Sequence, residues 1–393
     1  MRALRLRDFP LALDGSRPDF LIIAGEASGD EHAARMVEGL FCENPQVSVY
    51  AFGGKNLQAA GAHLLYDLTQ HAVIGLCEVL RNLGLFRQLL AAVIDWVAIH
   101  RPRTVCLVDY PGFNLRLAKR LFQRGLSRKG GGEVALYYYI SPQIWAWKAK
   151  RRFGMARWLD HLGLIFPFEK DFFADIPLRV SFVGHPLLCA KASFLSYAPQ
   201  GVLLLLPGSR VATVRRLFPL MLETFRRLQP QFPHLLAAVP YADEGVLEEL
   251  RGIFAGYEDL RSYLRFVSVS GPDLPCAASL MVSGTMSLSC ALAGIPGVIT
   301  HKIHPLSYFL ARHWVKIPYI GMANILLKRK SLPEYIQSEA EPSALCEEVS
   351  QCLRDPRRIE QAQQDAEALR AILGAQPDLK VAEWLLTSLE EKF

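Results

Sequence analysis

Short apolar runs alternate with helical patterns along almost the whole chain, and this alternation limits the fold more than any other feature. Buried strands that are joined by helices are typical of a parallel sheet covered on both faces. The strands expected in the first half are 20–24, 105–109, 134–140, 162–166 and 182–183, and the helices expected between them include 31–41, 78–100 and 115–123. The pattern predicts an α/β, doubly wound fold.

The same pattern starts a second time near residue 202. Between the two series, residues 189–200 show no clear period and carry a proline close to their end. We place a domain boundary there. The strands expected in the second series are 202–206, 235–240, 264–269, 280–282 and 297–300, and the helices expected in the charged tail are 343–353, 357–373 and 379–392. The sequence therefore predicts two similar β/α domains.

Length and charge narrow the class of protein. A chain of 393 residues is longer than one ordinary core supports, which agrees with two domains. The longest apolar runs, such as 89–94, are much shorter than the roughly 20 residues that span a bilayer. Residues 1–20 lack the continuous apolar segment of a cleaved secretory signal. A net charge of +6 together with 51% hydrophobic residues suits contact with anionic lipid. The sequence has no dense basic stripe, so nucleic-acid binding is not expected.

Several types of site are not expected, because the sequence lacks the residue patterns that they require. The eight cysteines form no CxxC pair and lie mostly in apolar segments, as reduced core residues of a cytosolic protein do. The ten histidines show neither HxH nor HExxH spacing, so no metal site is expected. The lack of a GxSxG elbow and of a P-loop argues against hydrolases and kinases.

The first expected strand ends in the turn Gly25–Asp30, and a helix follows at once. Glycines let a backbone approach a ligand, and the free N–H groups at a helix start can bind it. With only two glycines the turn is not the GxGxxG dinucleotide fingerprint. The alternative is a plain strand-to-helix turn in which Ser28 or Asp30 is the N-cap. Since doubly wound domains bind ligands at the carboxyl ends of their strands, we expect the active site in a cleft between the two domains.

Asp109 ends a second expected strand and precedes a Pro-Gly turn. A carboxylate at the carboxyl end of a buried strand is partly shielded from water, which suits a general base. Deprotonation of a sugar hydroxyl during attack on an anomeric carbon needs one such base. The alternative is that Asp109 only caps the next helix.

Residues 139–152 combine two tryptophans, Trp145 and Trp147, with four cations in the five positions 148–152. Aromatic faces stack on sugars or lie at a lipid interface, and cations can bind phosphate. A solvated basic helix with one tryptophan in the core is an equally good interpretation.

The second domain offers two turns suited to a diphosphate. Leu206–Arg210 places a glycine, a hydroxyl and a guanidinium after a strand. Ser283–Ser287 joins a later strand to a helix and offers hydroxyl and N–H groups. Either turn alone is weak evidence, but both in one domain favour a phosphate site.

The expected helix 78–100 has one apolar face. Packing against its own sheet is the commoner role of such a helix. An acyl-chain groove or a membrane-contacting surface is the alternative.

These segments together resemble bacterial lipid-A-disaccharide synthase. The resemblance runs in order from about residue 20 to about residue 340, and the SPxxWAW and PLxYxLAR…VKxPY segments are its most specific parts. The matching stretches are AGEASGD (24–30), VIGLCEVL (73–80), DYPGFNLRL (109–117), YISPQIWAWKAKR (139–151), PFEKDF (167–172), FVGHP (182–186), LPGSR (206–210), SGT (283–285) and the run 305–337.

The resemblance implies a GT-B fold with two Rossmann-like domains. We expect an acceptor-side domain over 19–190, a UDP-sugar-binding domain over 201–365, and C-terminal helices over 366–393 that return to the first domain. The implied reaction is inverting and needs neither metal nor cofactor. It transfers diacylglucosamine from UDP to the 6-hydroxyl of diacylglucosamine 1-phosphate, forming a β-1,6 disaccharide. A peripheral enzyme on the cytoplasmic face of the inner membrane is implied too, with a homodimer left open.

The resemblance also implies roles for residues. Asp109 matches the proposed catalytic aspartate and Glu26 an essential glutamate, while Arg210 and Asn324 match donor-site positions. The other substrate-binding residues expected are Ser28, Asn114, Trp145, Trp147 and His185, and the other UDP-binding residues expected are Gly208, Ser209, Ser283, Gly284, Thr285 and Ser289.

Three positions depart from the pattern of the family, which usually carries acidic residues where this chain has Gly112, Thr213 and Ser289. The last two bear on recognition of the uridine and ribose. Two other functions therefore stay open: another GT-B UDP-sugar enzyme, either a transferase or an epimerase, and a non-catalytic glycolipid-binding paralogue.

Overall fold

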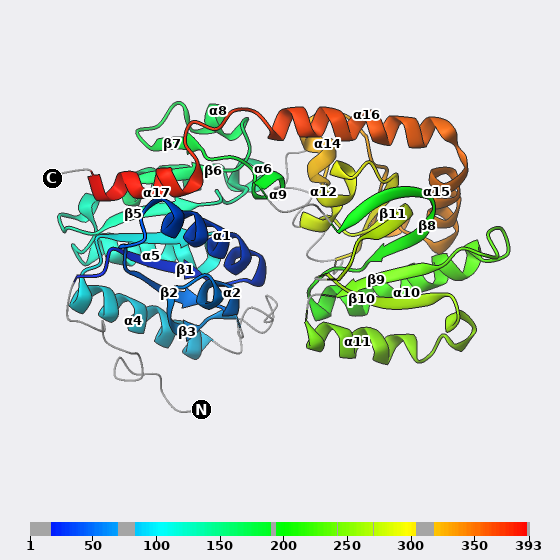
Figure 1. The fold of residues 1–393 in the computed structure, drawn as a ribbon, viewed down its shortest axis with the longest axis horizontal. Coiled ribbons are helices and arrows are strands. Elements are labelled where there is room, and N and C mark those ends of the chain that lie inside the picture. The colour runs from blue at the N-terminus through cyan, green and yellow to red at the C-terminus, as the bar shows by residue number, and fades with distance from the viewer. Residues whose placement is uncertain are drawn as a thin grey trace. The chain divides into compact units, whose positions relative to one another are not determined.

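The computed structural model describes residues 17–69, 83–189, 194–241, 243–269, 271–303 and 318–390. The chain forms two compact units, Met1–Pro186 with Ala375–Phe393, and Leu187–Gly374 (Figure 1). Each unit has its own parallel sheet with helices around it. The predicted α/β, doubly wound fold is confirmed in both units.

The sheet of the first unit has seven strands in the order β3-β2-β1-β4-β5-β6-β7, and all its pairs are parallel. The strands are β1 (Phe20–Ala24), β2 (Val49–Gly53), β3 (His63–Asp67), β4 (Thr104–Val108), β5 (Ala135–Tyr139), β6 (His161–Leu164) and β7 (Arg179–Phe182). The sequence predicted all of these except β2 and β3. The strand order reverses between β1 and β4, and a doubly wound sheet binds ligands at such a reversal.

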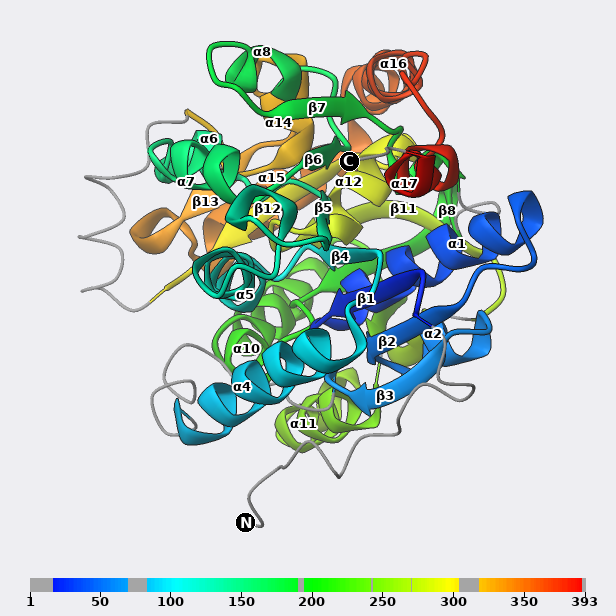
Figure 2. The same ribbon diagram turned by 90° about the vertical axis from the view of Figure 1, so that its left-hand side faces the viewer.

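Helices cover both faces of this first sheet (Figure 2). They are α1 (Ala27–Glu43), α2 (Lys55–Ala59), α4 (Leu83–His100), α5 (Pro111–Gln123), α6 (Ile144–Trp147), α7 (Arg151–Trp158), α8 (Glu169–Phe173) and α17 (Val381–Glu390), with a 3-10 turn, η3, at Arg128–Gly130. In α4, Val93, Trp96 and Val97 are fully buried in the core beside the sheet. The described part of the expected helix 78–100 therefore packs on its own sheet, and residues 78–82 lie outside the described residues.

The last helix, α17, belongs to the first unit and packs against α1. Its Trp384 is fully buried, with ring centroids 5.1 Å from Tyr137 and 5.6 Å from His161. Gly163 leaves room for this indole, because a Cβ there would lie 3.1 Å from it. The carboxyl terminus thus completes the core on the α1 side of the sheet.

The second unit has a six-stranded sheet in the order β10-β9-β8-β11-β12-β13, again with parallel pairs. Its strands are β8 (Leu195–Leu206), β9 (Ala237–Tyr241), β10 (Leu264–Ser268), β11 (Leu274–Met281), β12 (Gly297–His301) and β13 (Glu334–Ile336). Its helices are α9 (Pro186–Cys189), α10 (Val211–Leu228), α11 (Glu244–Phe254), α12 (Thr285–Leu292), α14 (Met322–Leu327), α15 (Pro342–Arg354) and α16 (Pro356–Leu373), with 3-10 turns η4 (Glu258–Leu260) and η5 (Gln337–Glu339). Here the order reverses between β8 and β11.

The domain boundary that we placed within residues 189–200 lies a few residues earlier, because the chain divides between Pro186 and Leu187. Residues 195–200 form the start of β8, where Leu195 and Ser196 pair with Leu274 and Pro275. The register shifts after that pairing, so this part of the strand shows no regular alternation.

Candidate active site

Glu26 and Asp109 follow the two strands at which the first sheet reverses its order. Ala24 at the end of β1 pairs with Val108 at the end of β4, so the two turns begin side by side. The ring of Tyr110 lies against Gly25, because a Cβ on Gly25 would be 2.1 Å from its Cδ1. The glycine after β1 therefore lets the two turns touch, and both carboxylates lie at the expected ligand-binding edge.

The backbone at Asp109 is in an unusual conformation. Asp109 and Tyr110 both have left-handed φ angles, 46° and 47°. This conformation costs a residue other than glycine about 1–3 kcal/mol, and such residues cluster at functional sites. The N-cap of α5 is Tyr110, so the interpretation of Asp109 as that cap is wrong.

Two side chains hold this turn through the carbonyl oxygen of Asp109. The Tyr138 hydroxyl donates to it at 2.6 Å, and the Asn114 amide nitrogen donates at 2.8 Å. Asn114 also donates to the carbonyl of Val108 at 3.1 Å and is fully buried. The prediction that Asn114 binds substrate is corrected: its amide has no exposed surface and instead positions the turn that carries Asp109.

The charges of Asp109 and Glu26 act on the same tyrosines. Burial raises the pKa of Tyr138 well above its usual value, and both carboxylates raise it further. Burial and Glu26 also raise the pKa of Tyr110. Both phenols therefore stay neutral near pH 7, and Tyr138 keeps the proton that it donates to the Asp109 carbonyl.

The rest of the first turn divides into exposed and structural residues. Ser28 is partly exposed in the first turn of α1. The N-cap of α1 is Glu26, so neither Ser28 nor Asp30 has that role. The Asp30 carboxylate is buried and accepts from the backbone N–H groups of Gly54, at 2.6 Å, and Asn56, at 3.0 Å. It therefore caps α2, a contact between residues more than 20 positions apart.

The tryptophan segment remains accessible. Trp147 is 45% exposed, and Lys148 Nζ lies 3.9 Å from the centroid of its ring. Trp145 is partly buried and donates to Glu169 at 3.2 Å. Burial raises the pKa of Glu169 to about 8. Trp145 is thus anchored, while Trp147 offers an open aromatic face beside a cation.

His185 was predicted to bind substrate, and only 5% of it is exposed. Its ring lies 5.0 Å from that of Phe166. Burial, with a smaller effect from His32, lowers the pKa of His185 to about 3. The imidazole is therefore neutral and packed, which leaves little of its surface for a ligand.

In the second unit, the two glycine turns follow the strands at the other reversal. Leu206 pairs with Met281, so the turns after β8 and β11 begin together. Gly208 has a φ of +103°, and a Cβ there would lie 3.3 Å from Thr213. Arg210 is exposed at the N-cap of α10. Ser209 is exposed beside it.

The turn after β11 leads into α12. Gly284 and Thr285 are exposed, and Ser287 fixes the helix start, because its Oγ accepts from Gly284 N at 3.2 Å. The Ser283 hydroxyl donates to the Ile320 carbonyl at 2.6 Å. The Ser289 hydroxyl donates back to Thr285 at 3.3 Å. The exposed surface suited to an anion is thus at 284–285 and 209–210.

Asn324 is buried and fully engaged, contrary to its predicted donor contact. Its amide nitrogen donates to the Leu332 carbonyl at 2.7 Å and to Glu334 at 2.8 Å. Its oxygen accepts from Leu332 N at 2.7 Å. Glu334 also accepts from the backbone of Ile320 and Gly321, each at 2.9 Å. The pair shapes the loop that receives Ser283, and sequence reasoning gave Glu334 no role.

Within the described part of the chain, neither a metal cluster nor a membrane-spanning helix is present. No group of three or more His, Cys, Asp and Glu side chains there could hold a metal ion. No described helix is long and apolar enough to cross a bilayer.

Comparison with known proteins decides the family. The sequence model described as lipid-A-disaccharide synthetase matches residues 20–385. The chain belongs to the lipid-A-disaccharide synthetase family. Lipid-A-disaccharide synthase 1 of Legionella pneumophila (strain Lens) is 34% identical to it over 387 residues, which cover 95% of this chain and 98% of the relative. The chain is therefore a glycosyltransferase that forms the lipid A disaccharide.

Solved structures show the fold independently. UDP-GlcNAc 2-epimerase from Neisseria meningitidis superposes with a TM-score of 0.55 at 11% identity, covering 90% of this chain and 98% of that one. The glycotransferase of kitacinnamycin superposes with a TM-score of 0.57 at 12% identity, and the match covers 95% of this chain and 99% of that one. Together with the two parallel sheets, these likenesses confirm the GT-B fold of the family member.

Proposed function

We propose that the chain transfers 2,3-diacylglucosamine from its UDP derivative to the 6-hydroxyl of 2,3-diacylglucosamine 1-phosphate, releasing UDP. Membership of the family supports the disaccharide product. The observation that carries the mechanism is the pair Asp109 and Glu26, which follow two paired strands at the reversal of the first sheet. Both residues are partly exposed, as a site for a ligand at this edge of the sheet requires.

Asp109 accepts the proton of the acceptor 6-hydroxyl as this oxygen attacks the anomeric carbon. The new bond joins that oxygen to the anomeric carbon, and the bond from this carbon to the UDP oxygen breaks. Attack opposite the leaving group inverts the α-linked donor, which gives the β-1,6 linkage. Glu26, with Ser28 beside it, holds acceptor hydroxyls next to the base.

The leaving diphosphate is held on the second unit. Arg210 neutralises its charge, and Gly208 and Ser209 let the backbone approach it. The exposed start of α12, at Thr285, adds N–H groups. Ser283 at this turn and Ser289 in α12 are the residues proposed to contact the ribose. The transfer requires this turn and the Asp109 carboxylate to engage one pair of substrates.

A membrane surface supplies both lipids in this proposal, at the cytoplasmic face of the inner membrane. Two exposed aromatic side chains support it, Trp147 at 45% and Phe153 at 56%. Lys148 and Arg152 lie over these rings, with 3.9 Å and 5.1 Å from cation to centroid. Aromatic and cationic side chains together suit an anionic interface.

The test is to incubate the purified full chain with both sugar lipids in mixed micelles and to measure UDP and disaccharide together. Equal amounts of both products are expected. Epimerised UDP-sugar without disaccharide would instead make the chain an epimerase. Binding of both lipids with no UDP release would make it a non-catalytic glycolipid-binding protein. Full turnover of a deacylated acceptor would show that the enzyme does not require a lipid acceptor.

A further inference from the structure

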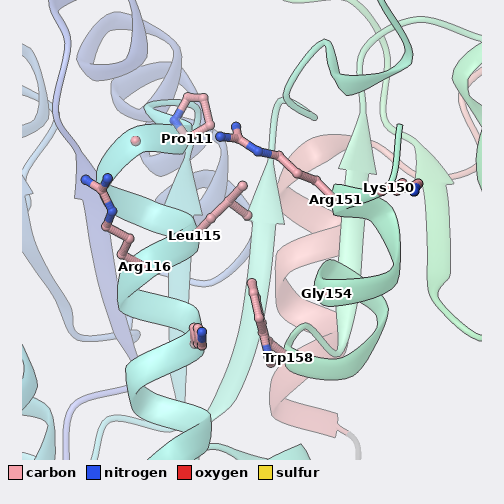
Figure 3. A pocket seen from close by; sticks show the side chains of 9 residues that line it. Pro111, Leu115, Arg116, Lys150, Arg151, Gly154 and Trp158 are labelled. Carbon is pink, nitrogen blue, oxygen red and sulfur yellow. The ribbon is translucent and has the colours of Figure 1, made fainter. Parts of the chain in front are cut away.

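A cavity of about 330 Å³ opens between α5 and α7 in the first unit (Figure 3). Leu115 and Trp158 form its apolar wall, and Pro111 and Gly112 border it where α5 begins. The four charged residues that line it are all cations: Arg116, Lys119, Lys150 and Arg151. No residue named so far as a donor-binding residue lines this cavity.

Among the described residues, the four cations lack a carboxylate partner of the kind that Arg152 has, although Arg116 lies over the ring of Phe86 and Arg151 over that of Trp147. Within the described part of the chain, none of the four has an ion pair with a carboxylate. Arg152, the residue after Arg151, instead donates to both oxygens of Asp175 at 2.7 Å. All four are exposed, and four positive charges around one hollow repel one another, so an anion that enters the cavity lowers this repulsion.

The cavity adjoins the turn that carries the proposed base. Pro111 follows Asp109 after one residue, and Figure 3 shows the Arg151 side chain reaching toward Pro111. The charge of Arg151 acts on Tyr138, whose hydroxyl donates to the Asp109 carbonyl. The charge of Arg116 acts on Tyr110 in the same turn. An anion in the cavity would therefore lie close to a substrate at Asp109.

We propose that this cavity binds the phosphate of the lipid-linked acceptor, with the adjoining apolar part of that lipid against Leu115 and Trp158. This inference rests on the proposed function, because the acceptor is the substrate that carries a phosphomonoester. A phosphomonoester carries a charge of about −1.5 to −2 near pH 7 and three acceptor oxygens, which matches several cations better than one. Held there, the phosphate fixes the far end of the acceptor sugar while its 6-hydroxyl reaches Asp109.

The discriminating experiment compares the phosphorylated acceptor with its 1-O-methyl analogue, which lacks the phosphate. Full-chain Lys119→Met and Arg151→Met are assayed with both acceptors, and Arg120→Met is the matched control. Arg120 follows Lys119 on the same helix, is exposed and does not line the cavity. Each variant of the cavity should lower kcat/KM for the phosphorylated acceptor ten-fold or more. The KM of the donor and turnover of the methyl analogue should stay within two-fold, as should all constants of the control.

Two results would overturn the proposal. Equal losses on both acceptors would show that the cations do not hold the phosphate. Unchanged discrimination in Lys119→Met and Arg151→Met, together with weaker binding of the variants than of the wild-type protein to phosphatidylglycerol vesicles but not to phosphatidylcholine vesicles, would assign the cavity to a membrane surface instead.

Failure of the proposed function gives a different result from failure of the phosphate site. If wild-type protein released no UDP, fluorescence titration with the two acceptors in micelles would still test the cavity. Binding that needs the phosphate and is lost in both variants would support the phosphate site without any transfer. Equal binding of both acceptors would reject it.

Discussion

The Tyr138 hydroxyl donates to the backbone carbonyl of Asp109 at 2.6 Å, which ties the proposed base to the strand beside it. Tyr138 lies in β5 and is fully buried, so its position is set by the core. Asn114 donates to the same oxygen from α5. A left-handed residue at the edge of a sheet is thus fixed by groups from two different elements.

Removing the Tyr138 hydroxyl should loosen the turn at Asp109, while the phenyl ring that remains still fills its place in the core. We expect Tyr138→Phe to lower kcat several-fold and the free energy of unfolding by about 1 kcal/mol, because one buried hydrogen bond is lost. Steady-state kinetics and urea unfolding measure the two effects. Tyr137→Phe is the matched control, because its hydroxyl lies 3.1 Å from Thr387 on α17. An equally large fall in kcat in Tyr137→Phe would show that the loss does not come from the hydrogen bond to Asp109.

Gly25 lets the turns that carry Glu26 and Asp109 touch, because it leaves room for the ring of Tyr110. A methyl group there would meet the ring of Tyr110 at 2.1 Å, so Gly25→Ala should displace Tyr110 and with it Asp109. We expect kcat to fall about 100-fold, as expected for misplacement of a catalytic group by about 1 Å. Gly252→Ala in α11 is the control, because a Cβ there meets nothing within 4 Å. It should stabilise the helix by up to about 1 kcal/mol and leave kcat unchanged.

Asp30 lies one helical turn after Glu26 at the start of α1 but has a structural role. Asp30→Asn removes a buried charge that accepts from Gly54 and Asn56 at the start of α2. We expect a loss of about 1–3 kcal/mol in unfolding free energy. The KM of both substrates should stay near the wild-type value at a temperature where the variant is folded. A changed KM with unchanged stability would contradict this role.

The stability of the first unit should pass through a maximum near pH 6.5. Burial lowers the pKa of His32 to about 4 and of His161 and His185 to about 3, from 6.5. The unfolded chain binds these protons first, so stability is lost as the pH falls below 6.5. Burial raises the pKa of Glu169 from 4.5 to about 8, so its contribution is lost as the pH rises through that range. Between pH 4.5 and 6.5 these three histidines outweigh the one carboxyl group, and between pH 6.5 and 8 the raised pKa of Glu169 lowers the stability.

Urea unfolding at pH 5, 6.5 and 8 measures this profile. Glu169→Gln should abolish the decline above pH 6.5. A stability that rises steadily from pH 5 to pH 8 in the wild-type protein would show that Glu169 does not hold its proton in the folded state.

The sequence predicted the sheets better than the site. Strands such as β1 and β4 are continuous apolar runs because helices cover both faces of the sheet. The edge strand β3 is mostly half-exposed and has no such run, and the first half of β8 contains Gln200 and Pro199. Neither β3 nor the first half of β8 carries enough regular apolar pattern to be recognised as a strand.

The roles of the site residues were harder to predict than the strands, because the burial of a side chain depends on partners that are distant in the sequence. Asn114 and Asn324 are polar residues in matching motifs, which suggested ligand contacts. Only the fold shows Asn114 reaching the carbonyls of β4 and Asn324 bonded to Leu332 and Glu334. The cationic cavity was hidden for the same reason, since its residues come from two separate helices.

The rate of a single turnover with Asp109→Asn tests the central claim most directly. Asparagine keeps the size of the side chain and removes its capacity to accept the proton of the 6-hydroxyl. With both lipids saturating, the account predicts a disaccharide-forming step slower by about 10²–10⁴-fold, the range that general-base catalysis supplies, with both substrate affinities within two-fold of wild type. A single-turnover rate close to that of the wild-type protein would contradict it.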